Sequence, residues 1–410
     1  MMASRIPRPA ARRARARGAA GGAWRGGALL AFAATASLAV AACNLDVTTP
    51  SRLQASKLNT PSAALTLVEG AQADFQCAFG NYLVVSGLIS GELSDATQTA
   101  SRWSYDRRVI DPSESQYSQS SCASLGIYTP LQTARFTNAS TLAKLQGWTD
   151  AEVANRQKLM AQTAAYAGYA ILLLGEGFCQ APGETLGPAL DQPALFAKAK
   201  DYFTTAIAAA QAASATDLLN LAYVGRARAE LDAGDLVAAK ADAALVPADF
   251  VYVLTTVSTS GRLENRVYAE NAHGAAVNIG ISYQKPDSFP VTLTSQLDSR
   301  RNPLWVQNKY TGLSAPYVVA SGAEAQLILA EANGTLSGQT LVDTRRQQLF
   351  LQGTRLYDIQ RFMKVNAALV PLEPPSGATY PKGGKYGDLN GKMCMPLPDI
   401  ESQNNPNING

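Results

Sequence analysis

Residues 218–246 read LLNLAYVGRARAELDAGDLVAAKADAALV, two alanine-rich stretches separated by a single Gly-Asp turn. Each stretch repeats its apolar residues with the period of an α-helix. Small residues recur on both sides of the turn, at Ala222, Gly225, Ala229, Ala239 and Ala243. Since a small side chain lets two helix backbones approach closely, this pattern predicts a pair of antiparallel helices packed against each other.

A second copy of the pattern precedes this one, so the hairpin is a repeat. Its two helices carry Tyr166, Ala170, Leu174 and Gly175 on one side and Ala199, Tyr202, Phe203 and Ala206 on the other. The spacing resembles that of tetratricopeptide repeats, although a proline-containing insertion interrupts the period. We therefore predict a mainly α protein with a tetratricopeptide-like helical-hairpin body over residues 125–246.

Other parts of the chain predict different structures. Thr60 followed by Pro61 predicts the start of a helix over 61–79, with Thr60 as its cap. Residues 101–124 lack periodicity and predict a long loop. Residues 247–319, which include RVYAENAH at 266–273, predict a smaller insertion of loops and short strands. The Gly- and Pro-rich residues 368–410 predict an extended, exposed tail.

The first 42 residues have the order of features of an export signal. Seven arginines and no acidic residue precede an apolar stretch from Ala28 to Ala42, which is too short to span a bilayer as a helix. The stretch ends in Val40-Ala41-Ala42-Cys43, which resembles a bacterial lipobox. We expect cleavage before Cys43 and acylation of its thiol, whereas the alternative is an ordinary signal peptide that happens to be followed by cysteine.

Removal of the signal changes both the charge and the cysteine count. The formal net charge falls from +3 to −4 without the seven arginines, which argues against a nucleic-acid partner. An even number of cysteines, expected to form disulfides in an oxidising compartment, then remains: Cys77, Cys122, Cys179 and Cys394. Three pairings are possible, and we favour Cys77 with Cys122 and Cys179 with Cys394. A zinc site is the alternative, but it lacks CxxC spacing and a nearby histidine.

The segment TRRQQLFLQGTRLYDIQRF at 344–362 resembles the RRxELxxEGxRxxDLxR signature of the SusD/RagB family. The matching positions are Arg345, Arg346, Leu349, Gly353, Arg355, Asp358 and Arg361. Gln348 and Gln352 stand where the family usually has glutamate, which puts its internal ion pairs in doubt. An AE…AEA helix at 323–332 and a PLPxxI…NPN ending extend the resemblance over nearly the whole chain after the signal.

The resemblance implies a lipid-anchored, nutrient-binding protein of the cell outer membrane that is not an enzyme. Such a protein captures a ligand, with oligosaccharide favoured over peptide, and acts as the lid of a SusC-like TonB-dependent transporter. It implies no cofactor and no metal. The predicted segments are a signal (1–42), a lipidated tether (43–60) and a SusD-like domain (61–410) that includes signature helices (320–367). The alternatives are a helical-repeat adaptor without a small ligand and a glycan hydrolase.

Aromatic and polar residues in the predicted loops are the candidate ligand contacts, because a flat ring with a polar edge suits a sugar. They are Trp103, Tyr105, Arg107, Tyr283, Asn302, Trp305 and Tyr310. The alternative for each ring is a place in the core or under a lid. The signature arginines are expected to bind carboxylates and helix ends inside the fold rather than ligand.

The lipobox and the family resemblance together predict what accompanies the native protein. We expect affinity isolation from detergent-extracted membranes to yield an N-terminal Cys43 with two or three acyl chains, together with a stoichiometric TonB-dependent barrel. Mass spectrometry of the N-terminus and of the co-isolated proteins measures both. An unmodified N-terminus without a barrel would contradict the anchor and the lid and favour the adaptor.

Overall fold

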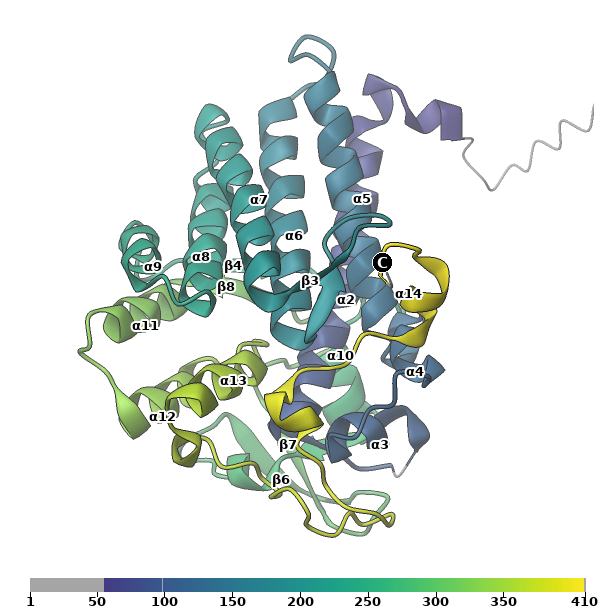
Figure 1. Cartoon of the computed structure of the whole chain (residues 1–410), viewed down its shortest axis with the longest axis vertical. Helices are drawn as coiled ribbons and strands as arrows, with labels where there is room; N and C mark the ends of the chain where they lie inside the picture. Colours follow the sequence, from purple (N-terminus) through teal and green to yellow (C-terminus); the bar gives the residue numbers. More distant parts are fainter. Residues whose placement is uncertain (1–54, 98, 409–410) are drawn as a thin grey trace, which may run out of the picture. The chain divides into compact units, whose positions relative to one another are not determined.

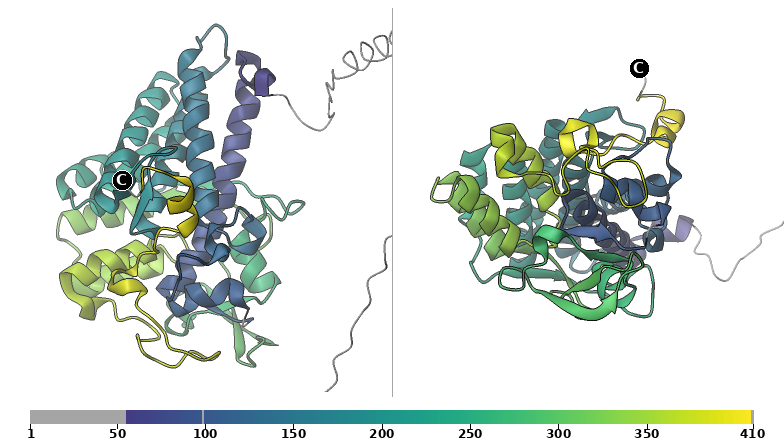
Figure 2. Two further views of the ribbon diagram at one scale, coloured as in Figure 1. Left: turned by 45° about the vertical axis from the view of Figure 1, so that its right-hand side comes forward. Right: turned by 90° about the horizontal axis from the view of Figure 1, so that it is seen from below.

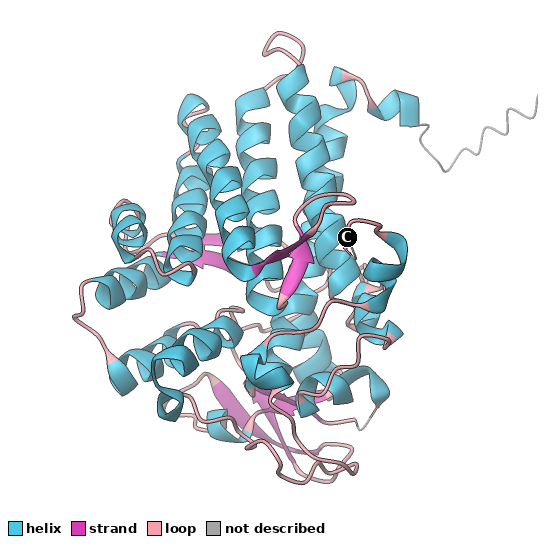
Figure 3. Cartoon of the chain, in the orientation of Figure 1, coloured by secondary structure: helices cyan, strands magenta, loops and turns pink. Residues whose placement is uncertain are grey.

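The computed structural model describes residues 55–97 and 99–408. The signal predicted for residues 1–42, Cys43 and most of the 43–60 tether lie outside the described residues. Figure 3 shows that helices dominate the described part of the chain and that its strands are short.

Long helices that follow one another along the chain form the body (Figure 1). They are α2 (Ala64–Ser90), α5 (Tyr128–Gly147), α6 (Arg156–Gly177), α7 (Gln192–Ala212), α8 (Thr216–Asp232) and α9 (Leu236–Ala243). Helix α6 contacts α5 and α7, and α8 contacts α7 and α9. The predicted tetratricopeptide-like hairpin body is therefore confirmed.

Small residues permit the close packing of these helices, as the sequence predicts. Gly168 of α6 and Gly225 of α8 both face the ring of Phe203 on α7. A Cβ atom at Gly168 would lie 2.8 Å from that ring, and one at Gly225 would lie closer still. Tyr169 packs edge-on against Phe203 with ring centroids 5.0 Å apart. The ring thus fills the space that two glycines leave open.

Local capping explains several helix ends. Asp191 and Asp235 accept amide N–H groups of the first turns of α7 and α9 at 3.0 and 3.1 Å. Gly234 ends α8 with φ of 82°, a conformation that costs glycine little. The cap predicted at Thr60 is wrong, because its hydroxyl donates to the carbonyl of Lys57 at 3.1 Å.

The described chain has four antiparallel pairs of short strands. The pairs are β1 (Leu93–Asp95) with β5 (Val277–Ile279), β2 (Gln180–Pro182) with β3 (Ala189–Asp191), β4 (Val251–Leu254) with β8 (Tyr317–Ser321), and β6 (Val291–Leu297) with β7 (Pro303–Gln307). Pairing of β1 with β5 and of β4 with β8 joins distant segments, and the other two pairs are local hairpins. The segment 247–319 does hold strands, as predicted. It is not self-contained, because β5 pairs with a strand that follows α2.

Two local predictions are wrong. Residues 101–124 are not one long loop, since they contain most of α3 (Ala100–Arg107), α4 (Ser115–Ser118) and a 3₁₀ turn at Cys122–Ser124. Residues 266–273 are helical rather than extended, as α10 (Arg266–Tyr268) followed by a π-helical turn. In the second case Asn265 caps the turn by accepting the amide of Tyr268 at 2.9 Å, a local signal that outweighs strand propensity.

The tail is less exposed than predicted, because it is bonded to the helical body. Cys179, just after α6, is joined to Cys394, and the amide of Cys179 donates to the carbonyl of Met395 at 2.9 Å. Met395 is buried, and the chain then forms α14 (Asp399–Asn404). The other disulfide joins Cys77 of α2 to Cys122. The structure thus has the pairing that we favoured, and the tail is anchored rather than free.

The signature segment folds as two helices with a tight turn between them. Helix α11 (Gly322–Ala332) precedes α12 (Gly338–Gln348) and α13 (Arg355–Asn366), and Gly353 in the turn has φ of 82°. Arg345 of α12 and Arg361 of α13 both pair with Asp358, at 2.9 and 2.8 Å. These two arginines bind carboxylates inside the fold, as predicted.

Matched glycine substitutions test the packing around Phe203. We expect Gly225→Ala to lower the free energy of unfolding by about 1–3 kcal/mol, because the new methyl group overlaps the ring. Gly70→Ala in α2 should raise it by about 0.5–1 kcal/mol, since Gly70 is exposed, has open space around it and gains helix propensity. Urea denaturation measures both changes. Equal effects of the two substitutions on the free energy of unfolding would contradict the close approach of α8 to the Phe203 ring.

Candidate functional site

A cavity of about 570 Å³ lies where four separate segments of the described structure meet. Its volume is within the range of sites that bind small molecules. The segments are the residues from the end of α2 to β1, helix α3, the stretch from β5 to β7, and the tail before α14. These elements gather in the lower part of Figure 1, and Figure 2 shows the tail from two other sides.

Part of the cavity lining is polar. Ser94, Asp106, Gln284, Arg300 and Asn302 contribute hydrogen-bonding groups to the lining. The Nε atom of Arg300 has no hydrogen-bond partner among the described residues and lies 3.9 Å from a carboxylate oxygen of Asp298. This part of the lining therefore offers both donors and acceptors to a ligand.

Asp106 is the buried acidic group of this part of the lining, with 3% of its surface exposed. Burial raises the pKa of Asp106 to about 7, although the amide of Asp95 and the charge of Arg300 oppose the rise. The hydroxyl of Tyr380 donates to its Oδ2 atom at 3.2 Å. Near neutral pH this carboxyl exchanges between a form that only accepts hydrogen bonds and one that also donates.

The rest of the lining is mostly apolar. Leu93 and Ile279 form part of the lining, and Ile281 stands at the rim with 81% of its surface exposed. The tail adds the ring of Tyr386 and three prolines, Pro374, Pro375 and Pro381. An apolar surface faced by a few fixed polar groups matches a ligand that has both hydroxyl groups and C–H faces.

Asn302 is the one predicted ligand contact that the structure brings to this cavity. Trp103 and Arg107 lie on α3 but do not line it, and both interact with the tail. The ammonium of Lys382 lies 5.3 Å from the ring of Trp103, and Arg107 lies over the ring of Tyr380 at 6.0 Å. These two residues therefore hold the tail beside α3.

The predicted tyrosine contacts are core residues, and Trp305 is half-buried in β7. Tyr105 and Tyr310 are at most 2% exposed, and their hydroxyls donate to the carbonyls of Leu125 and Leu351 at 3.1 and 3.0 Å. Tyr283 is also buried, between Phe289 and Phe350. Tyr105 and Tyr310 therefore have a place in the core, whereas Tyr283, although buried, also lines a smaller cavity.

Sequence reasoning missed Asp106, Arg300 and Tyr386. Asp106 lies between Tyr105 and Arg107, whose ring and positive charge are the more obvious candidates, and Tyr386 belongs to the tail that the sequence predicts to be exposed. Proline and tyrosine residues flanking Gly383 and Gly384 were a usable signal, because such a segment can fold back as an ordered turn.

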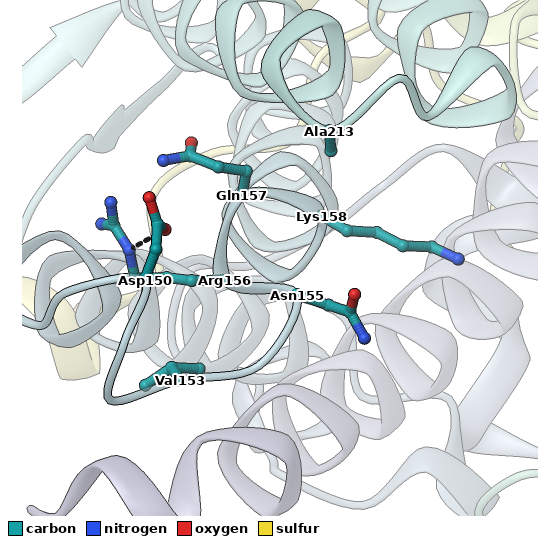
Figure 4. Close-up of a pocket in the computed structure, with 7 residues that line it drawn as sticks. All are labelled: Asp150, Val153, Asn155, Arg156, Gln157, Lys158 and Ala213. Atoms are coloured by element: carbon teal, nitrogen blue, oxygen red, sulfur yellow. Dashed lines mark hydrogen bonds and ion pairs between the residues drawn. The ribbon is translucent and has the colours of Figure 1, made fainter.

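A separate cavity of about 220 Å³ lies at the connection between α5 and α6, beside the end of α7 (Figure 4). Two of its charged groups are paired with each other, because Arg156 donates to Asp150 at 2.7 Å, and Arg156 also donates to the carbonyl of Leu145 at 3.0 Å. Lys158 is exposed to solvent. Val153 and Ala213 are its apolar lining residues, so it offers less apolar surface than the larger cavity.

Metal ligation and membrane spanning have no support in the part of the chain that the structure describes. Within residues 55–97 and 99–408, no three His, Cys, Asp or Glu side chains are grouped so that they could hold a metal ion. None of the helices described there is both long and apolar enough to cross a bilayer.

The raised pKa of Asp106 predicts a pH-dependent stability. The native carboxyl keeps its proton up to about pH 7, whereas an unfolded aspartate loses it near pH 4. The protonated Asp106 carboxyl thus contributes its full share to the free energy of unfolding at low pH, and this share is lost as the pH rises towards 7. We expect the wild type to lose about 1–3 kcal/mol of unfolding free energy relative to Asp106→Asn between pH 5 and 8. Urea denaturation over this range measures it, and exposed Asp287→Asn serves as the control. A constant difference would contradict this assignment.

Comparisons at the level of sequence found no relative. No protein-family model matches the chain, and no curated protein matches it.

Solved structures do match the described fold over most of its length. A SusD superfamily protein from Bacteroides fragilis is 14% identical and has a TM-score of 0.61 over 86% of this chain and 99% of its own. A SusD/RagB family protein from Bacteroides thetaiotaomicron has 12% identity and a TM-score of 0.62 over 83% and 94%. Surface glycan-binding protein A from Bacteroides fluxus has 12% identity and a TM-score of 0.62 over 83% and 96%. The chain therefore has the SusD fold, as its signature segment predicts.

Proposed function

We propose that the protein is a non-enzymatic carbohydrate-binding protein that takes up an oligosaccharide in the 570 Å³ cavity. The observation that carries this proposal is the mixed lining of that cavity. Sugars present apolar C–H faces rimmed by hydroxyl groups, so they need flat apolar contacts and hydrogen-bonding groups side by side.

The residues of the cavity supply both kinds of contact. The ring of Tyr386 and the prolines of the tail offer flat apolar surface, whereas Asn302, Gln284 and Asp106 offer donors and acceptors for hydroxyl groups. Because Ile281 is exposed at the rim, a ligand that extends out of the cavity gains apolar contact there as well.

Proteins of the same fold support the ligand class. One match is described as a laminarin-binding SusD-like protein, with 13% identity and a TM-score of 0.52 over 83% of this chain. Surface glycan-binding proteins A from Bacteroides fluxus and Bacteroides uniformis are further matches. Their names concern those proteins, and we extend the ligand class to this chain on the chemistry of its cavity.

The proposal includes a cellular location and a partner protein. The lipobox ending at Cys43 supports a lipid anchor at the outer membrane, and the family resemblance supports a SusC-like TonB-dependent transporter as partner. In this arrangement the protein holds the ligand and closes over the barrel as a lid. Its affinity then needs only to be moderate, because the ligand must be released into the transporter.

Calorimetric titration tests the ligand class. The probes are hexasaccharides derived from laminarin, starch, xylan and cellulose. We expect at least one to bind with 1:1 stoichiometry, and we expect Ile281→Asp and Asn302→Ala each to weaken it roughly tenfold, which corresponds to the loss of about 1.4 kcal/mol of contact energy. Both positions are exposed, so the substitutions leave the core intact.

Val237→Asp is the matched control, because Val237 is 82% exposed on α9 and is not part of the cavity. It should leave the affinity unchanged. Chromatography of the bound sugar after incubation should recover it intact. Failure of all four probes, or a product of hydrolysis, would contradict the proposal, and so would binding that is insensitive to both cavity substitutions.

A further inference from the structure

A smaller cavity of about 120 Å³ lies beside the signature helices and differs from the larger one in having two arginines in its lining. Its lining includes Arg346 of α12, Arg355 at the start of α13, and Ser282 and Tyr283 before β6. This volume is well above the roughly 10–15 Å³ that one water molecule needs. It therefore has room for a polar group of several atoms.

Arg355 is the unusual member of this lining. Its surface is 7% exposed, and neither Nε nor Nη1 has a hydrogen-bond partner among the described residues. No carboxylate of the described chain forms an ion pair with it within 4 Å. A buried guanidinium remains charged, so leaving its donors unpaired is costly unless a ligand accepts from them.

Arg346 adds a second, oriented cation. Its Nε and Nη2 atoms donate to the hydroxyls of Tyr283 and Ser282, both at 3.3 Å, and its guanidinium lies 4.6 Å from the centroid of the Tyr283 ring. Its contact with Asp343 is longer, at 3.6 Å, and that carboxylate is about half exposed. The ring and the two hydroxyls thus fix the direction of the guanidinium without neutralising it.

Two other acidic groups lie near these cations, but neither forms an ion pair with them within 4 Å in the described chain. Glu373 lines the cavity but is exposed to solvent, which screens its charge. Glu92 is buried, and its Oε1 atom already accepts the amide of Leu351 at 2.9 Å. Burial raises the pKa of Glu92, while that amide and the charges of Arg355, Lys309 and Arg346 oppose the rise.

We propose that this cavity binds an oxyanion held by Arg355 and Arg346. Planar guanidinium groups bind phosphate, sulfate and carboxylate oxygens through paired, charge-assisted hydrogen bonds. The oxyanion is either a free inorganic ion or an anionic substituent of a glycan. The second source follows from the position of the site, because Glu373 lines both this cavity and the larger one, which makes the two cavities neighbours. The site would distinguish charged from neutral ligands.

Titration of the full-length protein with sodium phosphate, and separately with sodium sulfate, at constant ionic strength tests the site without any carbohydrate. We expect saturable 1:1 binding. Arg355→Gln and Arg346→Gln should each weaken it at least tenfold, because each removes charge-assisted hydrogen bonds. Lys240→Gln, an exposed change of the same charge on α9, should have no effect.

Arg346→Gln keeps the test decisive if the buried Arg355→Gln variant does not fold. The side chain of Arg346 is 20% exposed, and thermal unfolding without phosphate checks that this variant retains its structure. Absence of saturable binding of both anions at millimolar concentration would overturn the proposal. Equal affinity in the wild type and a folded Arg346→Gln variant would also overturn it.

Comparison of galactose 6-sulfate with galactose in phosphate-free buffer identifies the source of the oxyanion. Tighter binding of the sulfated sugar, lost in Arg346→Gln, would support the site and assign it to a glycan substituent. Binding of inorganic phosphate without any gain from the sulfate group would support the site as one for a free ion. Both results are independent of whether neutral oligosaccharides bind the larger cavity.

Discussion

The buried guanidinium of Arg228 joins the repeat helices to the C-terminal helices. It donates to both carboxylate oxygens of Glu176 at 2.7 and 2.6 Å, and a third nitrogen lies 3.6 Å from Glu324. The three side chains are at most 4% exposed and come from α8, α6 and α11. Because removing one partner would leave an uncompensated charge in the core, at a cost of about 3–5 kcal/mol, these helices are constrained to stay together.

The signature segment extends this ion-pair cluster. Arg361 pairs with Glu331 of α11 at 2.6 Å as well as with Asp358. Glutamine at positions 348 and 352 does not disrupt these pairs, and the amide of Gln352 donates to the carbonyl of Gln348 at 3.1 Å. Among the described signature arginines, Arg345, Arg346 and Arg361 have carboxylate partners and Arg355 has none within 4 Å.

The larger cavity depends on constraints that lie outside the repeat helices. The disulfide between Cys179 and Cys394 holds the tail against the end of α6, while β1 and β5 bring the end of α2 to the strand region. Aromatic residues near these junctions mostly stabilise the fold. A large ring gains more from full burial than from partial exposure, which is why Tyr105, Tyr283 and Tyr310 are in the core.

Sequence alone determined the helical body, the hairpin spacing and the C-terminal signature helices. Each of these rests on short-range patterns, such as the helical period and small residues facing a neighbouring helix, and local patterns are visible in the chain itself. The composition of the cavity was decided only by the tertiary structure. Asp106, Arg300 and Tyr386 belong to three distant segments with no shared period, and they meet because long-range strand pairing, a disulfide and hydrogen bonds between α3 and the tail bring those segments together.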